Sequence, residues 1–203
     1  MLNRIYKRDK TQKIVSELLA KNKIVKLNLG CGTDYKKGWI NVDNNSDDNI
    51  ERLDLNWDIT KTLPFADNSV DYIFHEHFME HLTIEDSQRC IKDFMRVLKP
   101  GGIMRIAMPD LKDSINLYLN PNWRKDPLLK YGLAYVKTPA ELLNICFRSW
   151  GHQWIYDIEE LRRRLNDAGC TNIKQCKKGK STNKHLIGLE TREQSNLVVE
   201  VTR

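Results

Sequence analysis

The stretch Lys26-Leu27-Asn28-Leu29-Gly30-Cys31-Gly32 is a short apolar run that ends abruptly at two glycines. Its aliphatic composition predicts a β-strand over Ile24–Leu29, because the run is too short for a helix and is closed by a chain breaker. A glycine carries no Cβ, so Gly30 and Gly32 let the backbone turn sharply and approach a ligand closely. The sequence therefore predicts a ligand-binding turn directly after the first strand, although an ordinary tight turn would have the same pattern.

The residues after this turn limit the kind of ligand. A dinucleotide-binding turn has a third glycine three residues after the second one, and that position is Tyr35 here. The pyrophosphate-binding form of the turn is therefore excluded. A second strand is predicted over Trp39–Asp43, and Asp43 at its end suits a ribose, because one carboxylate can accept charge-assisted hydrogen bonds from two hydroxyls. These features fit a ligand that contains adenosine but no phosphates.

The composition is that of a soluble globular chain. The 203 residues are 40% hydrophobic and 30% charged, which fits a single domain of moderate size. No apolar run approaches the roughly 20 residues that cross a bilayer, and Met1–Arg8 lacks the apolar segment of a secretory signal. The five cysteines are scattered without a C-x-x-C pair, which indicates neither a disulfide framework nor a zinc cluster. We therefore expect a cytoplasmic protein with no membrane partner.

The formal net charge of +6 raises the question of an anionic partner. Much of the positive charge lies in Arg162–Arg164 and in Lys174–Lys184. Proteins that bind single-stranded nucleic acid usually place aromatic side chains among their basic residues for stacking, and Lys174–Lys184 has none. Solvated surfaces are the favoured interpretation, and a nucleic-acid partner is a second, less favoured one.

The remaining pattern predicts an α/β protein with a doubly wound, mainly parallel sheet of seven strands and an antiparallel edge strand. Further strands are predicted at Ile50–Leu55, Val70–Phe74, Ile103–Met108, Thr171–Cys176 and Leu197–Val201, and helices at Asp9–Ala20, Glu85–Leu98 and Asp157–Ala168. The first two strands are too close in sequence for a crossover helix, so we expect a shortened first crossover covered by the N-terminal helix.

One domain over 1–203 is expected to contain four segments. An N-terminal helical segment at 1–23 precedes a ligand-binding core at 24–110, an insertion at 111–155, and a C-terminal helix and strand pair at 156–203. The insertion is the least regular part of the chain and follows the fifth strand, at the edge where open α/β sheets bind ligands. It is predicted to be a lid or an acceptor-binding loop, with a purely structural excursion as the alternative.

Six motifs occur in an order that resembles a class I S-adenosylmethionine-dependent methyltransferase with a Rossmann-like fold. They are LNLGCG (27–32), WINVD (39–43), LDL (53–55), LPFADNSVDYIF (63–74), HFMEHL (77–82) and FMRVLKPGGIMRIAMPD (94–110). The resemblance covers Val25–Asp110. The later GHQWIYDIEELRRRLNDAGC (151–170) resembles the end of small methyltransferases associated with glycan and cell-surface biosynthesis. The chain departs from the family in lacking the helix between the first two strands.

The resemblance implies S-adenosylmethionine as the cofactor and a set of residues that bind it. The glycine turn would pass the methionine portion, Asp43 would bind the ribose, and Asp54 with Leu55 would contact the adenine, with Asp58 as an alternative to Asp54. The implied cofactor-binding residues are Leu29, Gly30, Cys31, Gly32, Asp43, Asn44, Asp54, Leu55, His75 and Glu76. A sulfonium is already a good leaving group, so no metal site is expected.

The segment His75–His81 and the later His152 supply the candidate catalytic groups, His77, His81 and His152. Histidine suits general-base catalysis at neutral pH. His77-x-x-Glu80-His81 also matches a zinc-protease string, which its position directly after a strand disfavours. A buried hydrogen-bonded pair of Glu80 and His81, and a His152 packed between tryptophans, are the structural alternatives.

The expected activity is in-line methyl transfer to a small or carrier-linked acceptor, by O-methylation and with a sugar as one example. An RNA methyltransferase is the second hypothesis, motivated by the positive charge. The chain lacks an Asn-Pro-Pro-Tyr-like motif after the fourth strand, which disfavours base N-methylation of that kind. A non-catalytic domain that binds the cofactor or a partner protein is the third hypothesis.

Overall fold

The computed structural model describes residues 2–44, 50–126, 129 and 132–203, with side chains from residue 10 onward. In this part of the chain seven strands form one sheet in the order β3-β2-β1-β4-β5-β7-β6. The strands are β1 (Lys26–Leu29), β2 (Ile40–Asp43), β3 (Leu55–Asn56), β4 (Val70–Glu76), β5 (Leu98–Met108), β6 (Asn172–Cys176) and β7 (Leu197–Thr202). Strands β1 to β5 are parallel, and β7 runs antiparallel to both β5 and β6. The predicted mainly parallel, seven-stranded sheet is confirmed.

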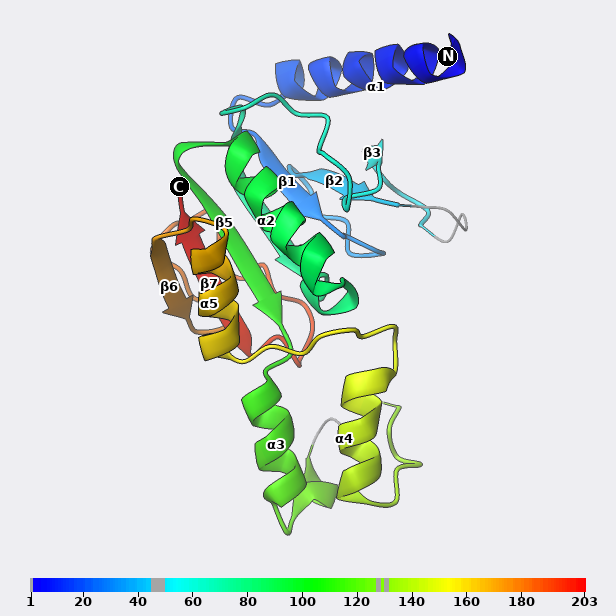
Figure 1. Cartoon of the computed structure of the whole chain (residues 1–203), viewed down its shortest axis with the longest axis vertical. Coiled ribbons are helices and arrows are strands. Elements are labelled where there is room, and N and C mark those ends of the chain that lie inside the picture. Colours follow the sequence, from blue (N-terminus) through cyan, green and yellow to red (C-terminus); the bar gives the residue numbers. More distant parts are fainter. Residues whose placement is uncertain (1, 45–49, 127–128, 130–131) are drawn as a thin grey trace.

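Five α-helices and two 3-10 turns in the described residues surround the sheet. They are α1 (Leu2–Lys21), η1 (Met79–His81), α2 (Ile84–Val97), α3 (Leu111–Leu119), η2 (Trp123–Lys125), α4 (Pro139–Arg148) and α5 (Ile158–Asp167). Figure 1 shows α2 and α5 over one face of the sheet, α1 beside the amino ends of the parallel strands, and α3 with α4 beyond their carboxyl ends. None of the helices in the described residues combines the length and apolarity needed to span a bilayer.

Helices α2 and α5 form where their sequences place a cap and an apolar stripe. The hydroxyl oxygen of Thr83 accepts a hydrogen bond from the Asp86 N–H at the start of α2, and the Asp157 carboxylate accepts one from the Glu160 N–H at the start of α5. The stripes of both helices are buried in the main core: Cys90, Ile91, Phe94 and Val97 from α2, and Leu161 and Leu165 from α5. Both helices confirm the sequence prediction within a residue or two.

The shortened first crossover is also confirmed. Strands β1 and β2 are parallel neighbours, and residues 30–39 connect them without a helix. Two buried amides hold this loop. Asn28 donates to the Asn41 side-chain oxygen over 2.9 Å, and the same oxygen accepts from the Lys36 N–H over 2.8 Å. The amides satisfy loop groups that a helix would otherwise pair internally.

The second face of the sheet is covered by the segment 177–196. Leu186 from this segment packs with Trp39, Phe74 and Val198 in a separate small core. Arg105 on β5 is fully buried and lies 2.5 Å from carboxylate oxygens of both Glu190 and Glu200. A buried guanidinium needs such partners to offset its desolvation. This ion-pair group therefore fixes the end of the segment against the sheet.

The third strand and the insertion differ from the sequence prediction. The prediction of a strand over Ile50–Leu55 is wrong, because β3 contains only Leu55 and Asn56. The insertion, expected to be irregular, contains α3 and α4, which begin at the capping side chains of Asp110 and Thr138. These helices enclose a third small core of their own, which comprises Trp123, Leu129, Leu133, Val136 and Leu142. The insertion is thus a packed helical unit.

The strand order reverses between β1 and β4, which makes this the switch point of the sheet. Open α/β sheets bind ligands at the carboxyl ends of the strands beside such a point. The glycine turn follows β1 and the histidine segment follows β4, so the two lie side by side. A Cβ placed on Gly30 would stand 2.7 Å from the Phe78 ring. Gly30 is therefore required by this close approach.

Candidate functional site

The glycine turn presents an open backbone surface. Gly30 and Gly32 both have positive φ angles, of 64° and 51°, which side-chain-bearing residues adopt at a cost. The Gly30 N–H donates to the Val42 carbonyl over 2.9 Å, which fixes the turn to β2. A Cβ on Gly32 would meet no described atom within 4 Å. The turn is thus rigidly held on one side and open on the other.

Asp43 lies at the end of β2, against this turn. One carboxylate oxygen accepts from the Gly32 N–H over 2.7 Å, and the other accepts from the Asn44 N–H over 2.6 Å. An ionised carboxylate has about four acceptor positions, so two positions remain for ligand hydroxyls. Asn44 is exposed beside it. This arrangement fits the ribose-binding role predicted for Asp43.

Leu29 and Cys31 contribute only backbone to the turn, because their side chains are buried in the interior. Burial also raises the pKa of the Cys31 thiol to about 12, with the charges of Asp43 and Asp34 adding to the effect. The thiol is therefore protonated and unreactive at neutral pH. The turn thus presents backbone groups and no reactive thiol.

The sequence predicts Asp54 near the end of the third strand, whereas in the structure Asp54 precedes β3. Its carboxylate accepts from the Asn41 N–H, from the Asn41 amide and from the Tyr35 hydroxyl, at 2.8, 2.9 and 3.0 Å. Leu55 is 4% exposed and packs in the main core. Asp54 thus joins the first crossover loop to β3 and has a structural role.

Trp57 and Asp58 occupy the carboxyl end of β3 instead. The Trp57 indole N–H is buried and has no partner among the described residues. Asp58 accepts from the Thr60 hydroxyl over 2.6 Å, and this bond lowers the pKa of the Asp58 carboxyl. Asp58 was the sequence alternative to Asp54 for the adenine contact, whereas Trp57 was missed. The only sequence signal at Trp57 is an aromatic residue that precedes an acidic one and follows a short apolar run.

Replacing Asp54 should therefore affect stability and leave cofactor affinity nearly unchanged. Asp54→Ala leaves the Asn41 N–H and the Tyr35 hydroxyl without their acceptor, and we expect a loss of about 1–3 kcal/mol in the free energy of unfolding. Urea unfolding followed by circular dichroism measures the loss, and isothermal titration with S-adenosylmethionine measures the affinity. A large loss of affinity in folded protein would restore Asp54 to the ligand site.

The side chains of His75 and Glu76, the last two residues of β4, contact other parts of the fold. His75 is fully buried between Phe78 and Phe94, and burial lowers the pKa of its imidazole to about 4, so the ring is neutral. Glu76 accepts from the Thr191 and Arg192 N–H groups and from the Thr191 and Ser195 hydroxyls. The prediction that His75 and Glu76 bind the cofactor is not supported by these positions. Glu76 instead anchors the loop 191–195.

His77 begins the histidine segment in a left-handed conformation, with φ of 50°, which is uncommon for histidine. Its N–H donates to the Ala107 carbonyl over 3.0 Å, which fixes the backbone. The ring Nδ1 lies 3.1 Å from a carboxylate oxygen of Glu80, and the ring Nε2 is buried without a partner among the described residues. A carboxylate beside one ring nitrogen leaves the other free to accept a proton.

His81 and His152 are brought together although they are far apart in sequence. Their ring centroids are 4.9 Å apart. The Glu80 carbonyl accepts from the Gln153 N–H over 2.8 Å, which ties the chain after α4 to η1. Burial lowers the pKa of the His81 imidazole, and the neighbouring charge of Glu80 opposes this shift. The three candidate histidines thus form one group at the carboxyl end of β4.

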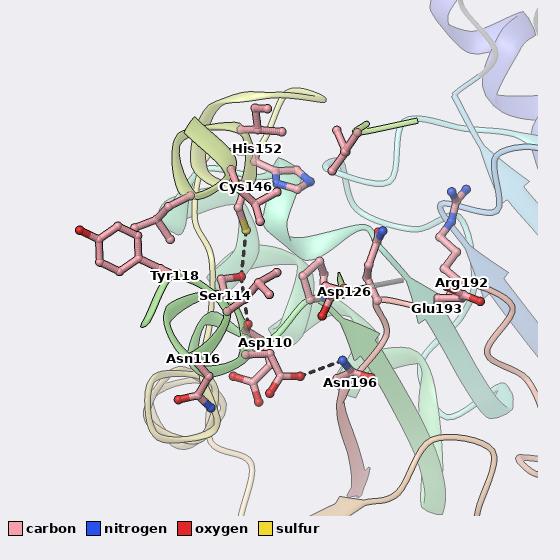
Figure 2. Close-up of a pocket in the computed structure, with 18 of the residues that line it drawn as sticks. Asp110, Ser114, Asn116, Tyr118, Asp126, Cys146, His152, Arg192, Glu193 and Asn196 are labelled. Atoms are coloured by element: carbon pink, nitrogen blue, oxygen red, sulfur yellow. Dashed lines mark hydrogen bonds between the residues drawn. The ribbon is translucent and has the colours of Figure 1, made fainter. Parts of the chain in front are cut away.

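A cavity of about 1010 Å³ lies between this histidine group, α3, α4 and the loop 192–196. Figure 2 shows Asp110, Ser114 and Cys146 in a row along one wall, with His152 at its end. Asn196 donates to Asp113 of α3 over 2.7 Å, which joins the loop 192–196 to this wall. Among the described residues the lining includes His77, His81 and His152 but neither the glycine turn nor Asp43. His77 precedes Phe78, whose ring lies against Gly30, so the histidine end of the cavity is the end near the turn.

Sequence reasoning placed an acceptor-binding element at 111–155 but missed most polar groups of the wall. Ser114, Asn116, Arg192 and Asn196 line the cavity, and none of them belongs to a recognisable motif. Arg192 and Asn196 arrive from the segment anchored by Glu76 and Arg105. Their presence depends on how that segment folds over the sheet.

Comparison with known proteins agrees with this geometry. Residues 27–106 match the methyltransferase domain family. The demethylmenaquinone methyltransferase of Staphylococcus saprophyticus is 26% identical over 152 residues, which cover 70% of this chain and 60% of that protein. The corresponding enzyme of Staphylococcus aureus is also 26% identical and is covered to 58%. The chain thus spans about three fifths of the length of these curated relatives.

Solved structures share the fold along nearly the whole chain. An S-adenosylmethionine-dependent methyltransferase from Thermotoga maritima aligns with a TM-score of 0.54 at 16% identity, covering 99% of this chain and 95% of that one. One from Archaeoglobus fulgidus aligns with a TM-score of 0.53 at 16% identity, covering 98% and 94%. A methyltransferase solved with the Haloferax volcanii Trm112 activator aligns with a TM-score of 0.51 at 16% identity, covering 96% and 90%.

The residues at the switch point fit the cofactor that this family uses. The carboxylate of Asp43 has acceptor positions left for two ribose hydroxyls, and the open side of Gly32 leaves room beside the backbone. The turn lacks the third glycine of a pyrophosphate site. The domain match over residues 27–106 and the sheet topology, which solved methyltransferases share, support a class I S-adenosylmethionine-dependent methyltransferase.

Proposed function

We propose that this chain transfers a methyl group to an oxygen atom of a small or carrier-linked acceptor, such as a sugar, held in the cavity. The observation that carries this proposal is the position of His77. It lines the cavity, with Nδ1 3.1 Å from Glu80 and with Nε2 buried and without a hydrogen-bond partner among the described residues. A base with one nitrogen oriented by a carboxylate is suited to removing a proton from a hydroxyl.

The residues of the chain would act as follows. Asp43 and the glycine turn would hold the cofactor. When bound, the cofactor supplies a methyl group on a positively charged sulfur, and the sulfur becomes a neutral thioether when the methyl–sulfur bond breaks. His77 Nε2 takes the proton of the acceptor hydroxyl as the oxygen–methyl bond forms, and later releases this proton to solvent. Glu80 stabilises the imidazolium during the transfer. The cavity walls align the acceptor oxygen and exclude water, which accounts for much of the rate.

The cavity wall supports a polyhydroxylated acceptor. Asp110, Ser114 and Asn116 offer carboxylate, hydroxyl and amide groups along α3 and its start. Several acceptors and donors on one wall can bind the hydroxyls of a sugar, and leaving them unpaired would cost free energy. The insertion at 111–155 is accordingly proposed as the acceptor-binding element.

Cofactor binding and turnover can be tested in two steps. First, thermal shift with S-adenosylmethionine, S-adenosylhomocysteine and NAD is expected to show stabilisation by the first two only. A ligand at a hundredfold excess over its Kd stabilises the folded state by about 2.7 kcal/mol. Second, cofactor labelled on the methyl group is incubated with acceptor pools from cell extract. Label in a small or carrier-linked product supports the proposal, and protection by NAD alone contradicts it.

An apolar ring is the second candidate acceptor. The cavity lining also includes the apolar side chains of Leu117, Leu133, Leu142 and Ile145, and the curated relatives are demethylmenaquinone methyltransferases. The labelled product distinguishes the two classes, because a lipid-soluble ring product extracts into organic solvent and a sugar product does not. A sugar on a lipid carrier would also extract, and hydrolysis would then release labelled free sugar.

The RNA hypothesis has weaker support. Arg163 and Arg164 in the basic run form ion pairs with Glu160, and Arg163 also pairs with Asp167. Part of the positive charge is therefore neutralised on the helix itself. RNA retention that weakens steeply with salt would favour RNA as the acceptor, and labelled product of any kind would exclude the non-catalytic hypothesis.

A further inference from the structure

Three potential metal ligands meet beneath the cavity. One ligand atom each from Glu80, His81 and His152 can be chosen so that all three lie within 4.8 Å of one another. Glu80 and His81 come from η1, and His152 follows α4. The imidazoles of His81 and His152 line the cavity, whereas Glu80 lies behind them with no exposed surface. The three side chains thus surround one point at the cavity floor.

The Glu80 carboxylate is the feature that most needs an explanation. It is fully buried, and neither of its oxygens meets hydrogen-bond geometry with any described residue. His77 Nδ1 is 3.1 Å away, and this contact involves one oxygen only. A buried carboxylate without hydrogen-bond partners is strongly unfavourable. The site therefore lacks a positive group that would face the second oxygen.

His152 is oriented in the way that metal-binding histidines usually are. The Nδ1 of His152 lies 2.7 Å from the Cys146 carbonyl, so this nitrogen is the donor and Nε2 keeps a free lone pair. Donation from one ring nitrogen to a carbonyl fixes the tautomer and directs the other nitrogen to a metal.

We propose that Glu80, His81 and His152 bind a divalent cation of the zinc class, with an open coordination position that faces the cavity. Two imidazoles and one carboxylate form a common ligand set of catalytic zinc sites. Ligands at 2.0–2.1 Å from one ion lie about 3.4 Å apart, so the three atoms must close in by about 1.4 Å from their present 4.8 Å limit.

This site differs from the zinc-protease arrangement considered from the sequence. There His77 and His81 would be the ligands and Glu80 the base. In the structure Glu80 is a ligand candidate together with His81 and His152, and His77 Nδ1 lies 3.1 Å from one oxygen of its carboxylate. The expectation that the chain has no metal site is revised by this proposal.

A cation at this position would bind the acceptor oxygen directly. A bound divalent metal lowers the pKa of a coordinated hydroxyl and so eases removal of its proton by a nearby base. His77 lines the same cavity and is the base proposed above. This catalytic role rests on the proposed function, whereas binding of the cation does not.

The test measures metal binding itself. Purified chain is stripped with a chelator, and Co²⁺ is titrated while visible absorption is recorded, because four-coordinate Co²⁺ absorbs far more strongly than hydrated Co²⁺. Zn²⁺ is then added to displace it. We expect one equivalent of Co²⁺ bound with strong absorption, and displacement by one equivalent of Zn²⁺. No binding at micromolar concentrations would overturn the proposal.

Variants locate the site. His152→Ala, His81→Ala and Glu80→Gln should each weaken Co²⁺ binding by roughly 100-fold or more, since each removes one of three ligands. His185→Ala is the matched control, because His185 lies outside the group and contacts Tyr72 instead. Thermal protection by S-adenosylmethionine verifies that each variant is folded. Equal Co²⁺ binding by all folded variants would place the ion elsewhere and overturn the assignment.

The outcomes separate this inference from the proposed function. Methyl transfer by chelator-treated, metal-free protein at the full rate supports the methyltransferase proposal and overturns the catalytic role of the cation. Co²⁺ bound at these three residues supports the site even when an acceptor pool yields no labelled product.

Discussion

The His77→Asn variant is expected to lose methyl transfer by about 10²–10⁴-fold, which is the usual contribution of a positioned general base, while its affinity for S-adenosylmethionine stays unchanged. Asparagine is chosen because it tolerates the left-handed backbone of this position better than most residues, where φ is 50°. The backbone N–H that donates to Ala107 is retained. The loss should therefore come from the missing imidazole.

Single-turnover transfer of labelled methyl to the extracted acceptor pool measures this effect, and isothermal titration measures cofactor affinity. His185→Asn is the matched control, with a ring that contacts Tyr72 outside the cavity, and should keep the parent rate. A His77→Asn protein that is folded, binds cofactor and transfers methyl at the parent rate would contradict the role of His77 as base.

The Asp43→Ala variant is expected to bind S-adenosylmethionine about 10²–10⁴-fold more weakly. Two hydrogen bonds to a charged acceptor contribute about 1.5–3 kcal/mol each, and every 1.4 kcal/mol is a factor of ten in Kd. The substitution also frees the Gly32 N–H, which the carboxylate now holds at 2.7 Å. The turn would then lose part of its fixed shape as well as its ribose acceptor.

The control for Asp43 is Asp71→Ala. Asp71 lies near the start of β4, where its carboxylate accepts from the Val25 N–H and from Lys99, both over 2.8 Å. Removal of this carboxylate should lower stability. The Kd for the cofactor should change by no more than about twofold, which is a much smaller free-energy difference than the 1.4 kcal/mol of a tenfold change. Isothermal titration of S-adenosylmethionine into both variants at matched ionic strength compares their cofactor affinities. Unchanged affinity in folded Asp43→Ala protein would place the cofactor elsewhere.

The part of the candidate site that sequence reasoning could predict is built from residues close together in the chain. Gly30, Gly32 and Asp43 belong to two short strands whose apolar pattern and breakers are local signals. Their contact follows from the parallel pairing of β1 and β2. The shortened crossover was predictable because ten residues, 30–39, cannot contain a crossover helix of ordinary length.

The choice between Asp54 and Asp58 was not predictable in this way. Both are acidic residues close to a short apolar run, and the extent of β3 decides which one follows the strand. That extent depends on Asn41, whose N–H and amide bind the Asp54 carboxylate. A pairing between two segments more than ten residues apart leaves no periodic signal in either segment.

Sequence alone determined the strand–helix alternation, the glycine turn and the acidic residue beside it, because hydrophobic period and backbone sterics act over a few residues. Only the tertiary structure decided that ligand atoms of His81, His152 and Glu80 lie within 4.8 Å of one another. It also decided that the insertion forms the helical wall of a cavity. The physical reason is that such groups meet through loop closure over many residues, which depends on how whole elements pack.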